Sequence, residues 1–127
     1  MKYRNLFLAL LAVACVAGLA LAADDLLKVA PKCCTVLLQN DEVRVLDYVA
    51  KPGEKVAMHT HPDHVVYALS DGKIRFTMED GTTKDVDIKK GQAIFNKAVT
   101  HSTENIGKTD VHVIIVEMTE EMKNMKH

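Results

Sequence analysis

From residue 35 onward, short apolar and β-branched segments alternate with turn-forming residues. Period-2 alternation, the pattern of a strand with one buried face, is clear in Val43/Val45, in Ile74/Phe76/Met78 and in Val86/Ile88. Asp80-Gly81 is a hairpin signal between two such segments. About eight strands at this spacing indicate an all-β sandwich or barrel. The predicted strands cover residues 36–39, 42–50, 64–69, 73–78, 82–88, 92–95, 101–106 and 111–118.

The two ends of the chain show other patterns. Residues 24–29 favour a short helical turn, and 119–127 form a polar tail containing Lys and Met, interpreted as a fraying helix or a disordered end. The domain core is expected to run from about residue 37 to 118.

The first 22 residues have the pattern of a secretory signal peptide. Lys2 and Arg4 begin the chain, residues 6–22 are apolar except for Gly18, and Ala20-Leu21-Ala22 forms a small-x-small cleavage pattern. We therefore predict cleavage after Ala22 and an exported protein, periplasmic or secreted, with no stable membrane insertion afterwards. A retained membrane anchor, short for a bilayer, and a lipoprotein carrying lipid on Cys15 are the alternatives.

Length and composition narrow the function classes. A chain of 127 residues allows one domain, here 23–127, after the signal. The formal net charge of −1 lacks the basic footprint that nucleic-acid binding needs, and 48% apolar residues exclude intrinsic disorder. In an oxidising compartment Cys33 and Cys34 could pair with another chain, serve as ligands or stay free thiols, because a bond between adjacent cysteines is strained. The sequence leaves these choices open.

The candidate chemistry lies in the histidines. His59 and His61 are two residues apart, so on a strand both imidazoles point to the same face. Neutral imidazoles side by side can chelate a divalent transition metal, with His101 as a third ligand from a distant strand whose face also carries Thr103 and Asn105. The alternative is a solvated surface pair.

These residues resemble the cupin family, a double-stranded β-helix or jelly-roll barrel. The first family motif is a Gly, five residues, His-x-His, three or four residues, a Glu, six residues and a Gly. This chain has Gly53, His59-Thr60-His61 and Gly72 at matching positions, with Val65 where Glu is expected, or Val66 in the longer spacing.

The second family motif is degenerate here. It reads Gly, five residues, Pro-x-Gly, two residues, His, three residues, Asn. This chain has Gly91, then Lys97 for the Pro and Val99 for the Gly, and His101 followed by Asn105, with a gap one residue shorter. The resemblance spans about residues 37–117. It implies a small cupin with one metal ion (Fe, Mn, Ni, Cu or Zn) at His59, His61 and His101.

The sequence allows more than one role for several residues near these histidines. His64 could be a fourth ligand, although strand parity turns it away from His59 and His61 unless Pro62-Asp63 forms a bulge. The same parity places Val65 and Tyr67 on the histidine face, where Tyr67 would line the barrel or pack in the core. His112, between Val111 and Val113, is predicted to be structural.

The resemblance implies a metal-dependent protein acting on a small organic molecule. Dioxygenase-type oxidation is favoured, because it needs little beyond an open metal position and a pocket, and no residue is an obvious general acid or base. The alternative is a non-catalytic binder, either a sensor or a storage module for metal or small ligand. Small cupins are commonly dimers, so a homodimer is a further expectation.

Overall fold

The structure, a computed structural model, describes residues 23–119. The predicted signal peptide with Cys15, and the tail after Thr119 with His127, lie outside the described residues. Within the part described, no helix is both long and apolar enough to span a bilayer.

The described chain is mostly β-structure, as predicted. A two-residue strand and one helical turn precede a series of longer strands. In chain order the elements are β1 (Asp24–Asp25), α2 (Leu26–Val29), β2 (Cys34–Gln39), β3 (Val43–Ala50), β4 (Lys55–His61), β5 (His64–Ala68), β6 (Gly72–Met78), β7 (Thr83–Ile88), β8 (Ala93–Asn96), β9 (Val99–Asn105) and β10 (Val111–Met118).

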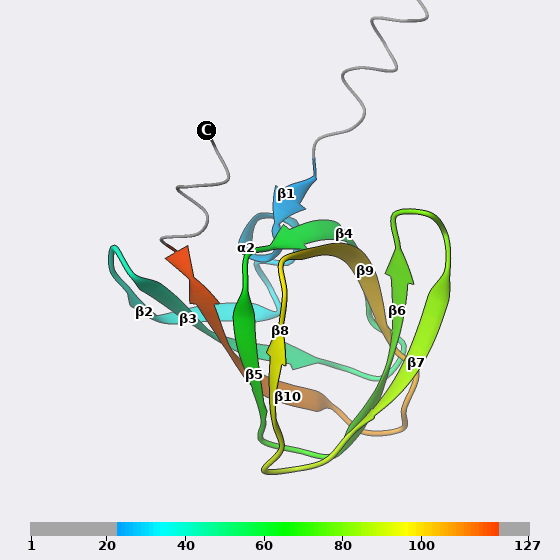
Figure 1. Cartoon of the computed structure of the whole chain (residues 1–127). Coiled ribbons are helices and arrows are strands. Elements are labelled where there is room, and N and C mark those ends of the chain that lie inside the picture. Colours follow the sequence, from blue (N-terminus) through cyan, green and yellow to red (C-terminus); the bar gives the residue numbers. More distant parts are fainter. Residues whose placement is uncertain (1–22, 120–127) are drawn as a thin grey trace, which may run out of the picture.

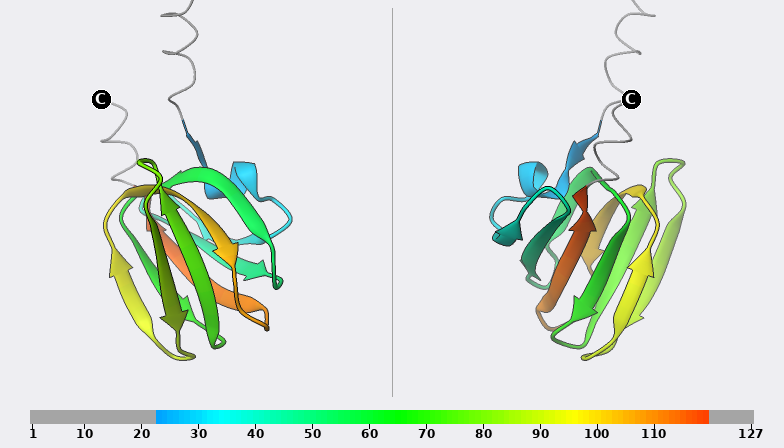
Figure 2. Two further views of the ribbon diagram at one scale, coloured as in Figure 1. Left: turned by 90° about the vertical axis from the view of Figure 1, so that its right-hand side faces the viewer. Right: turned by 60° about the vertical axis from the view of Figure 1, so that its left-hand side comes forward.

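The strands form two five-stranded sheets that face each other (Figure 1). One sheet has the order β1-β4-β9-β6-β7 and the other the order β2-β3-β10-β5-β8. Figure 2 shows both sheets from the side, curving around a common interior. Apart from the parallel β1–β4 pair, all the strand pairs are antiparallel.

Alternating side chains explain which faces meet. On β10, Val111, Val113 and Ile115 are buried, while the residues between them are partly exposed. On β3, Leu46 and Tyr48 occupy the buried face and Val43 and Val45 the outer one. A strand with a period of two therefore contributes one apolar row to the core between the sheets.

Hairpin turns set the register of β6 and β7. Gly81 has φ of 86°, a conformation that residues with a Cβ rarely adopt, and it ends the turn predicted from Asp80-Gly81. In this hairpin Gly72 pairs with Ile88 at one end and Thr77 pairs with Thr83 at the other. This register puts Ile74, Phe76 and Val86 on the face that lines the interior.

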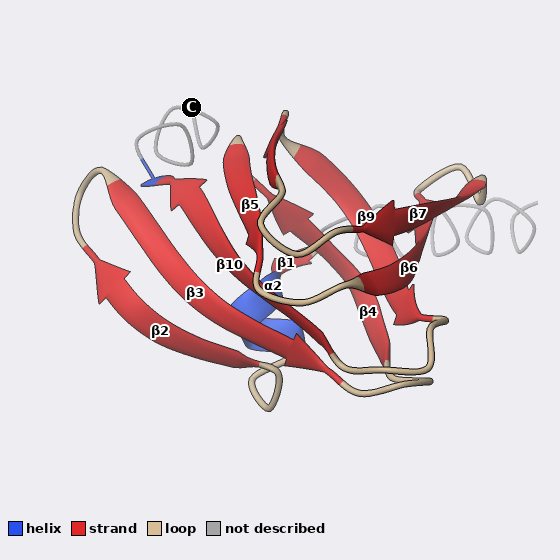
Figure 3. Ribbon diagram, turned by 90° about the horizontal axis from the view of Figure 1, so that it is seen from below, coloured by secondary structure: helices blue, strands red, loops and turns tan. Residues whose placement is uncertain are grey.

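The segment that begins the described chain closes part of the interior. Asp24 and Asp25 pair in parallel with His59 and Thr60 of β4. The carboxylate of Asp25 caps α2 by accepting the Lys28 backbone N–H at 3.0 Å, and Leu26 is only 2% exposed. The predicted helical turn is thus confirmed, and it packs against β4 (Figure 3).

The outer face of the second sheet is largely apolar. Successive strands align Leu38 with Val45, Val45 with Val116, Val116 with Val65, and Val65 with Phe95. Leu38 and Phe95 are 51% and 57% exposed.

Candidate metal centre

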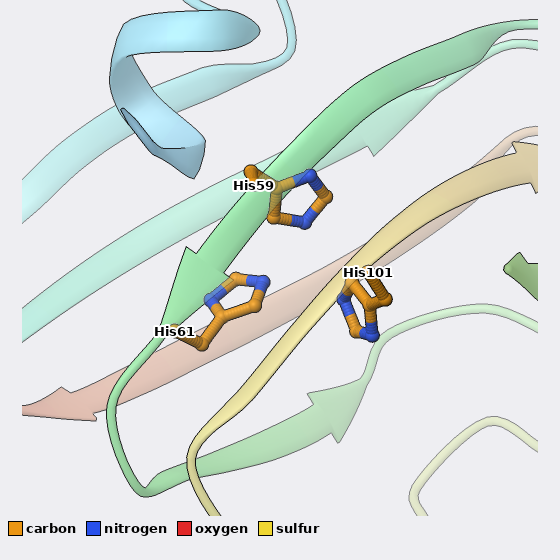
Figure 4. A group of neighbouring side chains, drawn as sticks. All are labelled: His59, His61 and His101. Carbon is orange, nitrogen blue, oxygen red and sulfur yellow. The ribbon is translucent and has the colours of Figure 1, made fainter. Parts of the chain in front are cut away.

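Two neighbouring strands bring three buried histidines together. His59 and His61 lie on the same face of β4, as predicted. His101 of β9 lies directly opposite His59 in the strand register. A register irregularity between Val56 and His59 precedes this pairing. The three side chains are shown in Figure 4. Their exposed fractions are 1%, 3% and 6%, so the interpretation as a solvated surface pair is wrong.

The imidazoles are close enough for one ion. The ring centroid of His59 lies 4.8 Å from that of His61 and 4.9 Å from that of His101, and the His61–His101 separation is 5.3 Å. One ring nitrogen from each residue lies within 4.8 Å of the other two, so the three histidines could hold a metal ion. Neutral nitrogen donors suit transition metals and are poor partners for Ca²⁺ and Mg²⁺.

Hydrogen bonds decide which nitrogen of His59 and His61 is free. Nδ1 of His59 lies 2.7 Å from the carbonyl oxygen of Ala57, which can only accept, so this nitrogen carries the proton. Nδ1 of His61 donates in the same way to the carboxylate of Glu117 at 2.9 Å. In both residues Nε2 therefore keeps its lone pair for a ligand bond.

Burial keeps the imidazoles of His59 and His101 neutral. Burial lowers the pKa of His59 to about 4. Burial, together with the neighbouring His59 and His61, lowers the pKa of His101 to about 3. Because only the neutral imidazole binds a metal, these shifts favour the ligand form at every physiological pH.

The histidines open onto a cavity of about 470 Å³, within the usual size range of small-molecule sites. Its wall is mainly aliphatic and aromatic, and none of the lining residues that the structure describes is acidic. Two exposed lysines, Lys84 and Lys97, also line it. The lining residues are Leu26, Tyr48, His59, His61, His64, Val66, Ile74, Phe76, Met78, Lys84, Val86, Ile88, Ile94, Asn96, Lys97, Ala98, Val99, His101, Thr103, Val113 and Ile115.

His64 lines this cavity, so strand parity alone gives the wrong face, and the expected exception, a break in alternation at Pro62-Asp63, applies. Its ring stacks on that of His61, with centroids 4.6 Å apart, and it is 4% exposed. β4 ends at His61 and β5 begins at His64, so the intervening Pro62-Asp63 interrupts the alternation. Burial lowers the pKa of His64, and its Nδ1–H donates to the Pro62 carbonyl at 2.8 Å.

The same break in alternation corrects two further predictions. Val66, and not Val65, lines the cavity, while Val65 pairs with Phe95 and Val116 on the outer face. Tyr67 is 44% exposed on that outer face, so it neither lines the barrel nor packs in the core. Val66 therefore occupies the position at which the family motif has its glutamate, and the motif matches with the longer of its two spacings.

Other predictions hold. Thr103 lines the cavity on the same strand as His101. Asn105 is buried, and its side-chain amide donates to the carbonyls of Ala50 and Thr109, both at 2.9 Å. His112 has a structural contact on the outer face, where its Nε2 lies 2.6 Å from the Asp47 carboxylate.

Cys33 and Cys34 are free thiols, both buried. The Cys33 thiol donates to the Glu54 carboxylate at 3.0 Å. Burial and the neighbouring Glu54 raise the pKa of Cys33 to about 12, and burial raises that of Cys34 to about 11. Thiols held in this protonated form are poor nucleophiles and poor metal ligands.

Two buried charges behind His61 were not anticipated from the sequence. Glu117 and Arg44 form an ion pair of 2.6 Å between Oε1 and Nη2, with their side chains 0% and 7% exposed. A signal was present, because alternation along 111–118 puts Glu117 on the same face as Val111, Val113 and Ile115. A charged residue on the inner face of the most apolar strand needs a partner.

Comparisons with known proteins identify the family and the fold of this chain. A family model for the cupin domain matches residues 47–117. The chain belongs to the cupin family. A search of curated proteins gave no significant match.

Solved structures show the same fold. A cupin domain from Bordetella pertussis is 23% identical with a TM-score of 0.62, covering 67% of this chain and 90% of that one. A cupin family protein with a double-stranded β-helix fold from Methanocaldococcus jannaschii is 18% identical with a TM-score of 0.57, covering 72% and 84%. A predicted oxalate decarboxylase from Thermotoga maritima is 29% identical with a TM-score of 0.50, covering 67% and 77%. The fold is therefore a double-stranded β-helix.

Proposed function

We propose that the protein binds one divalent transition-metal ion through His59, His61 and His101 and presents it to a small organic anion. The observation that carries this proposal is the cluster of three buried imidazoles that lines a mainly apolar cavity. His59 and His61 would ligate through Nε2, the nitrogen that their hydrogen bonds leave free.

The charge of the cavity supports an anionic ligand. Three neutral imidazoles leave the charge of a divalent ion uncompensated, and the lining residues that the structure describes include no carboxylate. A charge in a dry cavity is costly unless it is paired. Lys84 and Lys97, which also line the cavity, add positive charge, although Nζ of Lys97 lies 3.4 Å from a carboxylate oxygen of Asp63.

The wall of the cavity supports an apolar body on that anion. Phe76 and Met78 line the cavity from one sheet, and Val113 and Ile115 line it from the other. A carboxylate or enolate would meet the metal while an alkyl or aryl remainder packs against these side chains. The similar structure from Thermotoga maritima is named a predicted oxalate decarboxylase, and oxalate is a small carboxylate.

The chemistry that we propose is a dioxygenase-type oxidation. A redox-active ion would supply Lewis-acid and electron-transfer chemistry at this position. Among the chain's own residues, His64 lies beside the cluster with its Nδ1–H bonded to Pro62, so its Nε2 can accept a proton or a hydrogen bond from the ligand. The apolar wall excludes water from the reacting groups.

The alternative is a non-catalytic binder of metal or small ligand, in a protein exported after cleavage at Ala22. It is favoured by Val66, which leaves the centre without the carboxylate ligand of the family motif. Metal analysis of protein purified from its native compartment separates the two: iron or another redox-active metal supports oxidation, whereas zinc supports a binder.

The anion preference can be tested with Co²⁺ as a spectroscopic probe. The protein is stripped with a chelator, reloaded with Co²⁺ and titrated with hexanoate or with hexanamide, its neutral analogue of nearly equal shape. We expect hexanoate to change the visible Co²⁺ spectrum at a concentration at least about tenfold lower than hexanamide, because only hexanoate neutralises the centre. Equal effects would contradict an anion site.

A further inference from the structure

Glu117 is a buried carboxylate that the proposed reaction does not use directly. It is 0% exposed and lies near the end of β10, on the face that carries the apolar core residues. Its carboxylate lies behind His61, on the side of the ring away from the free Nε2, and Glu117 is not among the cavity-lining residues. It is placed to act on the ligand His61 and not on the substrate.

A continuous chain of polar contacts reaches His61 from the N-terminal segment. Asp25 accepts a hydrogen bond from Nη1 of Arg44 at 3.1 Å, and Nε of Arg44 donates to Oε1 of Glu117 at 2.7 Å. The second oxygen of Glu117, Oε2, accepts from Nδ1 of His61 at 2.9 Å. Both oxygens of the carboxylate are thus occupied, and its orientation is determined.

Stability alone does not account for this arrangement. A buried ion pair recovers its desolvation cost only partly, and apolar residues of similar volume often serve as well or better. The guanidinium of Arg44 lies 2.6 Å from Oε1 of Glu117, so the carboxylate has a charged partner in its buried position. A negative charge is therefore maintained beside one particular imidazole.

His61 differs in this respect from His59 and His64. The Nδ1–H groups of His59 and His64 donate to the backbone carbonyls of Ala57 and Pro62, which are neutral. The Nδ1–H of His61 donates to a carboxylate, which makes Nε2 a stronger electron donor to a metal and fixes the ring. Of these three imidazoles, His61 is therefore the one whose Nδ1–H has a charged partner.

We infer that Glu117 is a positioning residue of the metal centre that holds His61 with its proton on Nδ1 and supplies, through His61, negative charge that the centre lacks at Val66. This inference rests on the proposed metal site. Arg44 holds Glu117 in place, and Asp25 holds Arg44. The centre thereby gains anionic character while its open positions stay free for a ligand.

The direct test is the affinity for Zn²⁺, measured by competition with a chromophoric chelator. Glu117→Gln keeps the length of the side chain and removes its charge, and we expect Kd to rise by about tenfold to a hundredfold. The matched control is Asp47→Asn, which neutralises the carboxylate of the other carboxylate–imidazole pair, Asp47–His112, on the outer face. This control should keep Kd within about twofold.

A second variant guards against loss of folding. Glu117→Gln leaves the Arg44 charge partly unpaired in a buried position, which is destabilising. The double variant Arg44→Met/Glu117→Leu replaces both charges by apolar side chains, so it should fold, and it should still bind Zn²⁺ at least about tenfold more weakly than wild type.

The positioning role has its own readout in the metal-free protein. ¹⁵N NMR of the imidazoles should show His61 as a single tautomer with the proton on Nδ1. The double variant should show a mixture of tautomers at His61 and no change at His59, which keeps its bond to Ala57. A structural role for Glu117 would leave the His61 tautomer unchanged.

The outcomes separate the inference from the proposed function. If wild type binds Zn²⁺ and the folded Glu117 variants bind it equally well, the inference is wrong and the metal site stands. If His61 carries its proton on Nε2 in metal-free wild type, the inference is also wrong. If wild type binds no divalent transition metal while folded, the proposed function itself fails.

Discussion

His59 and His101 lie directly opposite each other on β4 and β9, with ring centroids 4.9 Å apart. The antiparallel hydrogen-bond ladder fixes this pair, so two of the three imidazoles are held by backbone geometry and not by a loop. A one-residue slip of either strand would turn its histidines to the outer face. The centre therefore depends on the register that follows the irregularity between Val56 and His59.

Replacing Val66 by Glu should add the carboxylate ligand of the family motif. Val66 lines the cavity, so we expect Val66→Glu to bind Mn²⁺ and Fe²⁺ more tightly than wild type. A tenfold gain in affinity corresponds to about 1.4 kcal/mol of added stability at saturating metal. Thermal unfolding with and without Mn²⁺ measures it. Without metal the variant should be less stable than wild type, because the new carboxylate is buried and unpaired.

Val65→Glu is the matched control. Val65 lies on the outer face in register with Phe95, so its carboxylate would meet solvent and not the histidines. The Mn²⁺-dependent stabilisation of this variant should equal that of wild type. A larger gain for Val65→Glu than for Val66→Glu would show that the strand face has been assigned wrongly.

The metal-free protein should lose stability on mild acidification. The folded state keeps the pKa of His59 near 4 and that of His101 near 3, and burial also lowers the pKa of His64. In the unfolded chain these groups take up protons near pH 6.5, so the unfolded state binds more protons below that pH. Each histidine then lowers the free energy of unfolding by up to about 1.4 kcal/mol per pH unit, from about pH 6.5 down to its pKa in the folded state.

Urea unfolding at pH 7.5, 6.0 and 5.0 measures this loss. The variant His59→Gln/His101→Gln should show a shallower dependence, since two of the responsible groups are gone. An equally steep dependence in that variant would assign the acid sensitivity to other groups.

His64 should matter more for the organic ligand than for the metal. The metal-binding group consists of His59, His61 and His101, and His64 lies beside it with its ring stacked on His61. We expect His64→Ala to keep Zn²⁺ affinity within about threefold and to weaken the effect of hexanoate on the Co²⁺ spectrum. A loss of Zn²⁺ affinity as large as that of His101→Ala would make His64 a fourth ligand.

Local alternation predicted an all-β sandwich or barrel and placed His59 and His61 on one face, while the resemblance to the cupin motifs supplied the jelly-roll fold and the three-histidine site with His101. The spacing of His59 and His61 and the motif around His101 do not depend on where each strand begins or ends. Parity failed at Pro62-Asp63, where one strand ends and the next begins, and this single break misplaced His64, Val65 and Tyr67. Alternation is a property of one strand and does not carry across a turn.

The Arg44–Glu117 pair shows a different limit. Alternation could place each residue on an inner face, but their contact with each other and with His61 depends on how three strands are ordered in two sheets. β3 and β10 are neighbours in one sheet and β4 belongs to the other. Contacts between sheets follow from the closed barrel and are not encoded in any local pattern.

The central claim is that three histidines from β4 and β9 bind one metal ion, and the metal content of His101→Ala tests it most directly. His101→Ala and His112→Ala are stripped, dialysed against equal Zn²⁺ and analysed by mass spectrometry, with folding checked by circular dichroism. We expect wild type and His112→Ala to hold one ion per chain. His101→Ala should bind more than about a hundredfold more weakly, since a lost ligand exceeds the usual effect of a lost outer contact. Equal occupancy in the two folded variants would contradict the account.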